Sequence, residues 1–268
     1  MQILVFNAGS SSLKFGIFDV GAETREIFKG SYERFRDGSC EYRFRHGETD
    51  ERGAAAFASP GNALKGVPDA LKRFALDSID AVGHRIVHGG ARFSGPTLLD
   101  DDTVEAIATL TPLAPLHNPA NLEAVRLCRS LWPNLPQVAV FDTAFHLTNP
   151  AFATTYAVPA EWRDAGLRRY GFHGLSHAYC TGRAAEMLQR PVVGKLIVCH
   201  LGNGCSVSAV RDGDSVDTSM GFTPLEGLVM GTRSGDLDPA VVLRLARELG
   251  IDEAEALLNQ KSGLLGLS

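Results

Sequence analysis

The sequence predicts an α/β fold in which mixed sheets are flanked by helices and the opening unit recurs later in the chain. Short strands come first, helical patterns then alternate with buried strands, and a strand–polar turn–strand unit appears twice. This order of elements is typical of layered α/β architectures. The matching positions of the two units are Gly9 with Gly202, Ile17 with Val210 and Asp19 with Asp212, each pair at one constant separation. The constant separation favours an internal duplication.

Length and composition set the class of protein. The chain has 268 residues, 44% hydrophobic and 21% charged, which is ordinary for one or two globular domains and excludes disorder as the main state. The net charge of −5, with no basic block, disfavours nucleic acid or a membrane as partner. Five cysteines without a Cys-x-x-Cys pair argue against a disulfide framework and favour a cytoplasmic location.

The N-terminal part is predicted to be a β-meander. Residues 3–6 form an apolar run, and residues 13–17 alternate apolar with other side chains, the period of a strand. Asp37-Gly38 predicts a hairpin turn between strands at 32–35 and 40–44. A helix is expected to follow Pro68, with Leu71, Phe74 and Ala75 on one face.

Helices and buried strands then alternate. We expect a strand near 79–87, then a helix that opens at Asp101 or Asp102 and keeps residues up to Thr111 in register. A second helix is expected to start at Asn118-Pro119 and to include Trp132. A buried strand over 137–141 ends at Asp142, and a turn signal at 149–150 is taken as the boundary between domains 1–149 and 150–268.

The second half begins like the first. The pattern predicts strands over 195–199, up to 210 and over 215–219, with a polar turn at 200–204 after the first of them. Two amphipathic helices follow, and the last residues, 261–268, are expected to form a glycine-rich turn.

Two polar turns are candidate phosphate sites. Between the first two strands, Asn7-Ala8-Gly9-Ser10-Ser11-Ser12-Leu13-Lys14 combines small residues with hydroxyls and an amine, so that backbone N–H groups can converge on an anion. The segment lacks the spacing of a Walker loop, and by itself it could be a plain polar hairpin. The second turn, residues 200–204, strengthens the interpretation because paired hairpins of this kind hold nucleotide phosphates.

Two arginines and one aspartate are candidate catalytic groups. Arg85 stands at a predicted strand end, Arg233 lies in the glycine-framed loop 231–235, and Asp142 directly follows a buried strand. Phosphoryl transfer needs forked cations for the equatorial oxygens and a carboxylate to orient the nucleophile or to bind Mg²⁺. The alternatives are surface ion pairs for the arginines and a turn cap for Asp142.

The histidines do not predict a zinc site. His84 with His88 and His173 with His177 have a spacing of four, but neither pair has a third ligand or an adjacent Glu. His173 is interpreted as a neutral or cationic donor to developing charge. His46, His146 and His177 are interpreted as helix or surface histidines.

Seven motifs together resemble the acetate kinase family. They are Asn7-Ala8-Gly9-Ser10-Ser11-Ser12-Leu13-Lys14-Phe15, His84-Arg85-Ile86-Val87-His88-Gly89-Gly90, Leu116-His117-Asn118-Pro119, Phe141-Asp142-Thr143-Ala144-Phe145-His146, Tyr170-Gly171-Phe172-His173-Gly174, His200-Leu201-Gly202-Asn203-Gly204 and Gly231-Thr232-Arg233-Ser234-Gly235-Asp236. The family belongs to the acetate and sugar kinase, heat-shock protein and actin superfamily. The resemblance therefore implies two duplicated ribonuclease-H-like (actin-like ATPase) domains. It also implies that the second domain is incomplete and the chain shortened at its C terminus, because the further strands and helices expected of that domain are not found after Arg233.

The resemblance also implies residue roles. Asp142, His173 and Arg233 resemble the catalytic residues; Arg85 resembles the substrate-binding arginine, and Val87, Leu116, Phe172 and Pro224 the apolar pocket for the substrate methyl group. Ser10, Ser12, Lys14 and the loop His200, Leu201, Gly202, Asn203 and Gly204 resemble nucleotide-phosphate contacts, and Asn7 the magnesium-site residue.

The implied reaction is reversible in-line transfer of the γ-phosphoryl group of ATP to acetate, which gives acetyl phosphate and ADP. The implied cofactor is Mg²⁺, with Mn²⁺ as a substitute, and a homodimer is expected of the intact protein. The alternatives are a kinase for propionate, butyrate or another short-chain acid and a non-catalytic, actin-like nucleotide switch.

Overall fold

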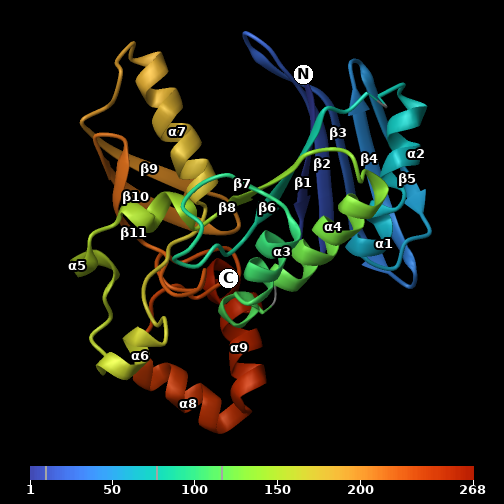
Figure 1. Cartoon of the computed structure of the whole chain (residues 1–268). Coiled ribbons are helices and arrows are strands. Elements are labelled where there is room, and N and C mark those ends of the chain that lie inside the picture. Colours follow the sequence, from blue (N-terminus) through green and yellow to red (C-terminus); the bar gives the residue numbers. More distant parts are fainter. Residues whose placement is uncertain (10, 77, 116) are drawn as a thin grey trace. The chain divides into compact units, whose positions relative to one another are not determined.

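The computed structural model describes residues 1–9, 11–76, 78–115 and 117–268 (Figure 1). The chain divides into two compact units, Met1–Phe141 and Asp142–Ser268. The boundary expected at 149–150 therefore falls within the second unit. There the 3₁₀ helix η2 (Ala144–Thr148) packs against strand β11 (Asp214–Thr218).

The first unit is built on a mixed sheet flanked by helices, as predicted. Its strands are β1 (Gln2–Ala8), β2 (Ser12–Val20), β3 (Thr24–Arg36), β4 (Ser39–His46), β5 (Thr49–Ala55), β6 (Ala81–Ile86), β7 (Thr97–Leu98) and β8 (Gln137–Phe141). Their order in the sheet is β5-β4-β3-β2-β1-β6-β8-β7. β6 runs parallel to β1 and β8, and the other pairs are antiparallel. The sheet is mixed because β1–β5 form an antiparallel meander, whereas β6 and β8 are reached through helical connections and run parallel to β1.

Helices cover one face of this sheet. They are α1 (Pro60–Leu64), α2 (Val67–Arg73), α3 (Asp101–Ala108), the 3₁₀ helix η1 (Thr111–Leu113) and α4 (Asn118–Leu131). Figure 1 shows α1, α2 and α4 along the sheet. Phe6, Phe15, Phe28 and Phe44 are buried between the strands and these helices. Strand residues alternate between faces, so the opposite face carries Lys14, Lys29 and other polar side chains.

The second unit repeats the opening pattern. Its elements are α5 (Ala151–Thr154), α6 (Ala160–Asp164), α7 (Gly174–Met187), β9 (Lys195–Leu201), β10 (Cys205–Arg211), β11, α8 (Pro239–Leu249), α9 (Ile251–Gln260) and α10 (Gly263–Leu267). The sheet order β11-β10-β9 corresponds to β3-β2-β1, and every pair is antiparallel. A backbone hydrogen bond closes each first hairpin, from Gly9 to Ser12 over 2.8 Å and from Gly202 to Gly204 over 3.1 Å.

Several predicted helix ends are wrong, each for a local reason. α2 ends at Arg73, so Phe74 and Ala75 lie outside it, and Ala75 has a left-handed φ of 55°. α3 ends at Ala108 because Pro112 has no N–H to continue it, and Thr111 belongs to η1. α4 ends at Leu131, with Trp132 as its C-cap.

The C-terminal residues also differ from the prediction. The expected glycine-rich turn contains helix α10, which begins at Gly263 with a left-handed φ of 64°. A side chain at Gly263 would collide with the Met230 carbonyl oxygen, 2.2 Å from the Cβ position. Within the described residues, no helix is long and apolar enough to cross a membrane.

Candidate active site

Three neighbouring strands of the first unit bring Lys14, Asn7 and Arg85 into one row. Asn7 on β1 is opposite Lys14 on β2, and β1 runs parallel to β6 with Phe6 beside His84. Nη1 of Arg85 donates a hydrogen bond to Oδ1 of Asn7 over 2.9 Å. The structure therefore places the predicted magnesium-site residue and the predicted substrate-binding arginine in direct contact.

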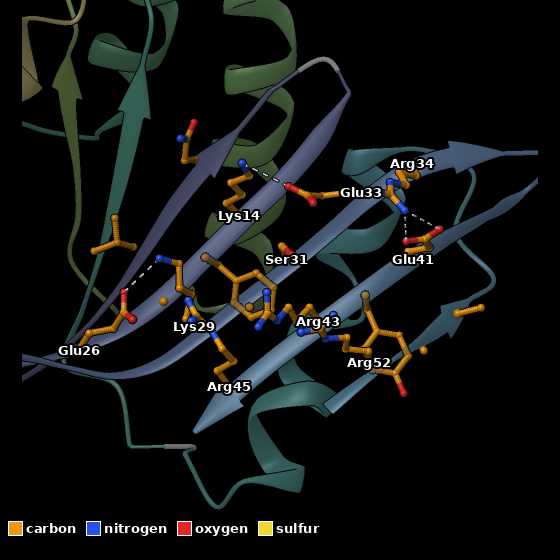
Figure 2. Close-up of a pocket in the computed structure, with 18 of the residues that line it drawn as sticks. Lys14, Glu26, Lys29, Ser31, Glu33, Arg34, Glu41, Arg43, Arg45 and Arg52 are labelled. Carbon is orange, nitrogen blue, oxygen red and sulfur yellow. Dashed lines mark hydrogen bonds and ion pairs between the residues drawn. The ribbon is translucent and has the colours of Figure 1, made fainter. Parts of the chain in front are cut away.

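Lys14 lies on the polar face of the sheet. Its ammonium is 3.2 Å from a carboxylate oxygen of Glu33, and the two side chains are 56% and 43% exposed. Both side chains line a hollow of about 890 Å³, as do Asn7, Arg43 and Arg45. Figure 2 shows the pair of Lys14 on β2 with Glu33 on β3, and Arg43 and Arg45 on β4. An ion pair this exposed contributes little, so the amine is available to exchange Glu33 for a phosphate.

Two buried asparagines of α4 hold the backbone around this row. Asn121 accepts a hydrogen bond from the Val87 N–H over 3.0 Å and donates one to the Ala8 carbonyl over 2.6 Å. Asn118 accepts from the His88 N–H and donates to the His88 carbonyl, both over 3.1 Å. The asparagines thus tie the ends of β1 and β6 to one helix. Sequence reasoning missed Asn121, although a polar residue beside the apolar stripe of a helix could have indicated it.

The other predicted residues of this unit are placed individually. Val87 is only 6% exposed, just beyond β6, and Ser12 begins β2. Ser10 and Leu116, predicted to bind phosphate and the substrate methyl group, lie outside the described residues.

In the second unit, the backbone of Asp142 contacts the start of α7, directly after His173. Asp142 is 2% exposed, and its carbonyl accepts a hydrogen bond from the Gly174 N–H over 2.8 Å. A Cβ at position 174 would lie 2.3 Å from that carbonyl oxygen, so the contact requires glycine. His173 precedes the helix with a left-handed φ of 60°, a strained conformation of the kind found at functional sites.

Gly204, in the polar turn 200–204, lies beside two predicted catalytic side chains. A Cβ at this position would be 3.3 Å from Nη1 of Arg233 and 3.4 Å from Nε2 of His173. The same Nη1 lies 3.4 Å from the carbonyl oxygen of Pro224. The structure thus brings four predicted residues together: His173, Gly204, Pro224 and Arg233.

The charge of Arg233 is not neutralised by a carboxylate. Across the described ranges, Arg233 forms no ion pair. Burial, which disfavours the charged form, lowers the pKa of its guanidinium. A partly buried cation without a counter-ion, beside a glycine backbone and an imidazole, is suited to hold an anion.

The loop 231–235, which carries Arg233, is fixed by the polar turn 200–204 and by α10. The Gly231 N–H donates to the Asn203 carbonyl over 2.9 Å, and a Cβ at 231 would lie 2.0 Å from Oδ1 of Asn203. The Leu264 and Leu265 N–H groups donate to the Met230 and Gly231 carbonyls, each over 2.9 Å. The prediction of a turn at 261–268 missed these hydrogen bonds between α10 and the loop.

An ion pair holds the loop that carries Pro224. Glu226 accepts from Nη2 of Arg169 over 2.5 Å and from the Tyr156 hydroxyl. The same hydroxyl accepts from the Phe222 N–H over 2.8 Å, and Arg169 also donates to three carbonyls at 218–220. Burial, followed by the hydrogen bond to Glu226, raises the pKa of Tyr156. Sequence reasoning missed these three residues because they are far apart in the chain.

Four histidines of this unit lie near one another. The His173 and His200 rings are stacked with centroids 4.1 Å apart, and His146 and His177 are 5.6 Å apart. His146 and His177 are 1% and 0% exposed, so a surface position is wrong for both; His177 lies on helix α7 and His146 on η2. In the described part of the chain, no group of three or more His, Cys, Asp or Glu could hold a metal ion.

The remaining predicted residues have mixed environments. Phe172 is buried at 2% exposure, whereas Leu201 at the end of β9 is 73% exposed. Nδ1 of His200 is 2.9 Å from the Ser176 hydroxyl on α7. Gly202 closes the turn that Asn203 and Gly204 share.

Known proteins resemble this chain over nearly its full length. The acetokinase family model matches residues 2–268. An acetate kinase from Deinococcus radiodurans is 51% identical over 274 residues, which cover 100% of this chain and 68% of the relative. An acetate kinase from Streptomyces avermitilis is 50% identical over 278 residues, which cover 99% of this chain and 68% of the relative.

Solved structures have the same fold. A propionate kinase from Francisella tularensis matches with a TM-score of 0.93 and 44% identity, covering 99% of this chain and 69% of that protein. The acetate kinase of Porphyromonas gingivalis matches with a TM-score of 0.90 and 38% identity, covering 100% of this chain and 69% of that protein. The chain therefore belongs to the acetokinase family.

Proposed function

We propose that this protein is an acetate kinase, a phosphotransferase with a carboxyl group as acceptor. It transfers the γ-phosphoryl group of ATP to acetate, giving acetyl phosphate and ADP, and it catalyses the reverse reaction. The observation that carries the proposal is the guanidinium of Arg233, which lies beside Gly204 and His173 and forms no ion pair with any residue that the structure describes. Such a cation can neutralise a phosphoryl group during transfer.

The proposed chemistry is a direct in-line displacement. An acetate oxygen forms a bond to the γ-phosphorus while the bond to the bridging oxygen breaks, and the electron pair leaves with ADP. The transition state carries charge on the three equatorial oxygens, so positioning and electrostatic stabilisation provide most of the catalysis. Arg233 and His173 are the proposed stabilising groups, Arg85 the binder of the acetate carboxylate, and Asp142 the essential acidic residue.

Nucleotide binding is assigned to the two hairpin turns. Ser10, Ser12 and Lys14 are the proposed phosphate contacts of the first turn, and residues 200–204 are those of the second. The small residues, the hydroxyls and the lysine of these turns support this role. The exposed pair of Lys14 with Glu33 leaves the ammonium able to bind a phosphate.

Magnesium is proposed to arrive with the nucleotide. Asn7 supplies an amide oxygen, a ligand type that Mg²⁺ accepts, but this oxygen already accepts a hydrogen bond from Arg85. The donor set fits contact through water better than a cage of protein ligands, because Mg²⁺ keeps several waters when phosphates bind it. The ion would neutralise phosphate charge, and Mn²⁺ is the proposed substitute.

The acid substrate is chosen by an apolar pocket. Val87, Leu116, Phe172 and Pro224 are the proposed contacts of the acetate methyl group. One methylene changes binding by only about 1–3 kcal/mol, so propionate is the natural competitor. The likeness to a solved propionate kinase makes this the second candidate function. A homodimer and a cytoplasmic location remain predictions.

A hydroxamate assay tests the proposal. The chain is incubated with ATP, Mg²⁺ and acetate, propionate or butyrate, and acyl phosphate is trapped with hydroxylamine. We expect acetyl hydroxamate, a higher kcat/KM for acetate than for the longer acids, and a loss of about 100-fold or more in Arg233→Ala. The matched control is Arg25, which is 76% exposed and does not line the hollow beside Lys14, so its substitution by Ala should leave the rate unchanged. Nucleotide binding without acyl phosphate would instead indicate the actin-like switch.

A further inference from the structure

A single buried hydroxyl connects two histidines of the second unit. Ser206 lies on β10 and is 0% exposed. Its Oγ is 2.9 Å from Nδ1 of His173 and 2.8 Å from Nε2 of His177. A serine hydroxyl has one hydrogen to donate, so it can donate to only one of these two nitrogens.

The second nitrogen of His177 determines the direction of this network. In the described part of the structure, Nδ1 of His177 is buried and has no hydrogen-bond partner. A buried N–H without an acceptor is rarer in native proteins than an unfilled acceptor position. The hydrogen of His177 therefore belongs on Nε2, which is also the intrinsically preferred tautomer of a neutral imidazole. Burial, together with His146 and His200 nearby, lowers the pKa of His177 to about 4, so the ring is neutral at pH 7.

We infer that His177 and Ser206 fix His173 as a neutral imidazole with its hydrogen on Nε2. His177 Nε2–H donates to Ser206 Oγ, and the Ser206 hydroxyl donates to His173 Nδ1, which must then be unprotonated. The network leaves Nε2 as the nitrogen of His173 that carries a hydrogen. This is the nitrogen 3.4 Å from the Cβ position at Gly204, where Arg233 also approaches.

The surroundings of His173 support the neutral form. The Arg233 guanidinium lies within 3.3 Å of the same Cβ position, so a cationic imidazole would stand close to another positive charge. A nearby positive charge disfavours protonation of the imidazole. The His200 ring is also stacked on His173, at a centroid distance of 4.1 Å.

The inference rests on the proposed function and deepens it. Sequence reasoning allowed His173 to be a neutral or a cationic donor, and the network selects the neutral one. Ser206 and His177 are positioning residues: neither is assigned a contact with substrate, and both act through the tautomer of His173. A neutral Nε2–H group can stabilise charge on a phosphoryl oxygen without a proton being transferred.

The tautomer can be measured directly by nitrogen-15 NMR of the histidine rings. Two-bond proton–nitrogen spectra of the full chain, with His173 assigned by its loss in His173→Gln, distinguish the Nε2–H form, the Nδ1–H form and the cation. We expect the Nε2–H form at pH 7.5 and an averaged tautomer in Ser206→Ala. Ser208→Ala is the matched control, because Ser208 is also 0% exposed on β10 but bonds to Thr218, 3.1 Å away.

Kinetics provides the second readout. We expect Ser206→Ala to lower kcat by about 10- to 100-fold, with the KM values for ATP and acetate changed by less than about 3-fold, and Ser208→Ala to stay near the unaltered rate. An Nδ1–H or cationic His173 in the unaltered chain would overturn the inference, as would an unchanged tautomer in Ser206→Ala. Because the unaltered chain alone reports its tautomer, a variant that fails to fold still leaves a decisive result. A fixed Nε2–H tautomer in a chain without kinase activity would instead count against the proposed function.

Discussion

Arg85 and Asn7 are joined side chain to side chain, with Nη1 of the guanidinium 2.9 Å from Oδ1 of the amide. The bond spans the parallel strands β1 and β6, so each side chain restricts the other. The contact uses one edge of the guanidinium fork on the protein. The bond fixes the plane of the guanidinium relative to Asn7, and a fixed plane is what recognition of a planar carboxylate requires.

Replacing Arg85 by lysine should separate charge from geometry. Lysine keeps the positive charge but cannot hold Asn7 and a carboxylate in the same planar arrangement. We expect kcat/KM for acetate to fall by about 100-fold, with KM for ATP changed much less. Steady-state assays with each substrate varied give both values. Arg25→Lys, near the start of β3 and 76% exposed, should change neither, and equal losses in the two variants would contradict the role of Arg85.

Asp142 offers a test of charge at constant shape. The side chain is nearly fully buried, and its backbone carbonyl binds the first residue of α7. Asp142→Asn keeps that backbone bond and the side-chain volume, so we expect a folded protein with kcat lowered by about 100-fold or more. Thermal unfolding and the hydroxamate assay should be run on the same preparation. An active, folded asparagine variant would limit Asp142 to a structural role.

Two glycines of the second unit should respond in opposite ways to alanine. At Gly204 the new methyl group would meet Arg233 and His173 at 3.3–3.4 Å, so Gly204→Ala should lower kcat by about 10-fold through crowding of the anion position. Gly182, on α7, has no atom within 4 Å of its Cβ position. Gly182→Ala should leave kcat unchanged and raise the free energy of unfolding by about 0.5–1 kcal/mol. Urea titration and initial rates distinguish the two effects.

The Pro224 loop should depend on the charge of Glu226. Glu226→Gln weakens the bonds to Arg169 and Tyr156, which are partly buried, and we expect a loss of about 2 kcal/mol in the free energy of unfolding with a raised KM for acetate. The comparison is Glu248→Gln on α8, whose pair with Arg244 is 57–77% exposed and should contribute less than about 0.5 kcal/mol. Similar losses in both variants would show that the loop does not rely on this pair.

The sequence was sufficient where local chemistry decides the structure. Asp37 and Gly38 form the predicted turn with left-handed φ values of 49° and 77°, and α4 begins at Asn118-Pro119 as expected. It was insufficient where the structure depends on contacts between residues far apart in the chain. Arg169 meets Glu226 across 57 positions of sequence, and His173 meets Ser206 across 33. Strand β5 has the sequence TDERGAA, which has no strand periodicity and is held by its pairing with β4.

Buried histidines in both units should make the stability fall in mild acid. Burial lowers the pKa values of His84, His88, His146 and His177 to about 4, from an ordinary value of 6.5. Below pH 6.5 the unfolded chain binds protons that the folded chain does not bind until about pH 4, so stability is lost as the pH falls through this window. Each such histidine contributes at most about 1.4 kcal/mol per pH unit.

Urea unfolding at pH 7, 6 and 5 and constant ionic strength measures this effect above the range in which ordinary carboxylates titrate. His84 contacts Gln137 at 2.9 Å and stacks on Phe6, and His84→Phe removes one of the titrating groups. We expect the variant to lose stability less steeply between pH 6.5 and pH 5 than the unaltered chain does, whatever its stability at pH 7. A stability that does not change over this range in the unaltered chain would mean that these histidines are protonated in the folded protein, contrary to their burial.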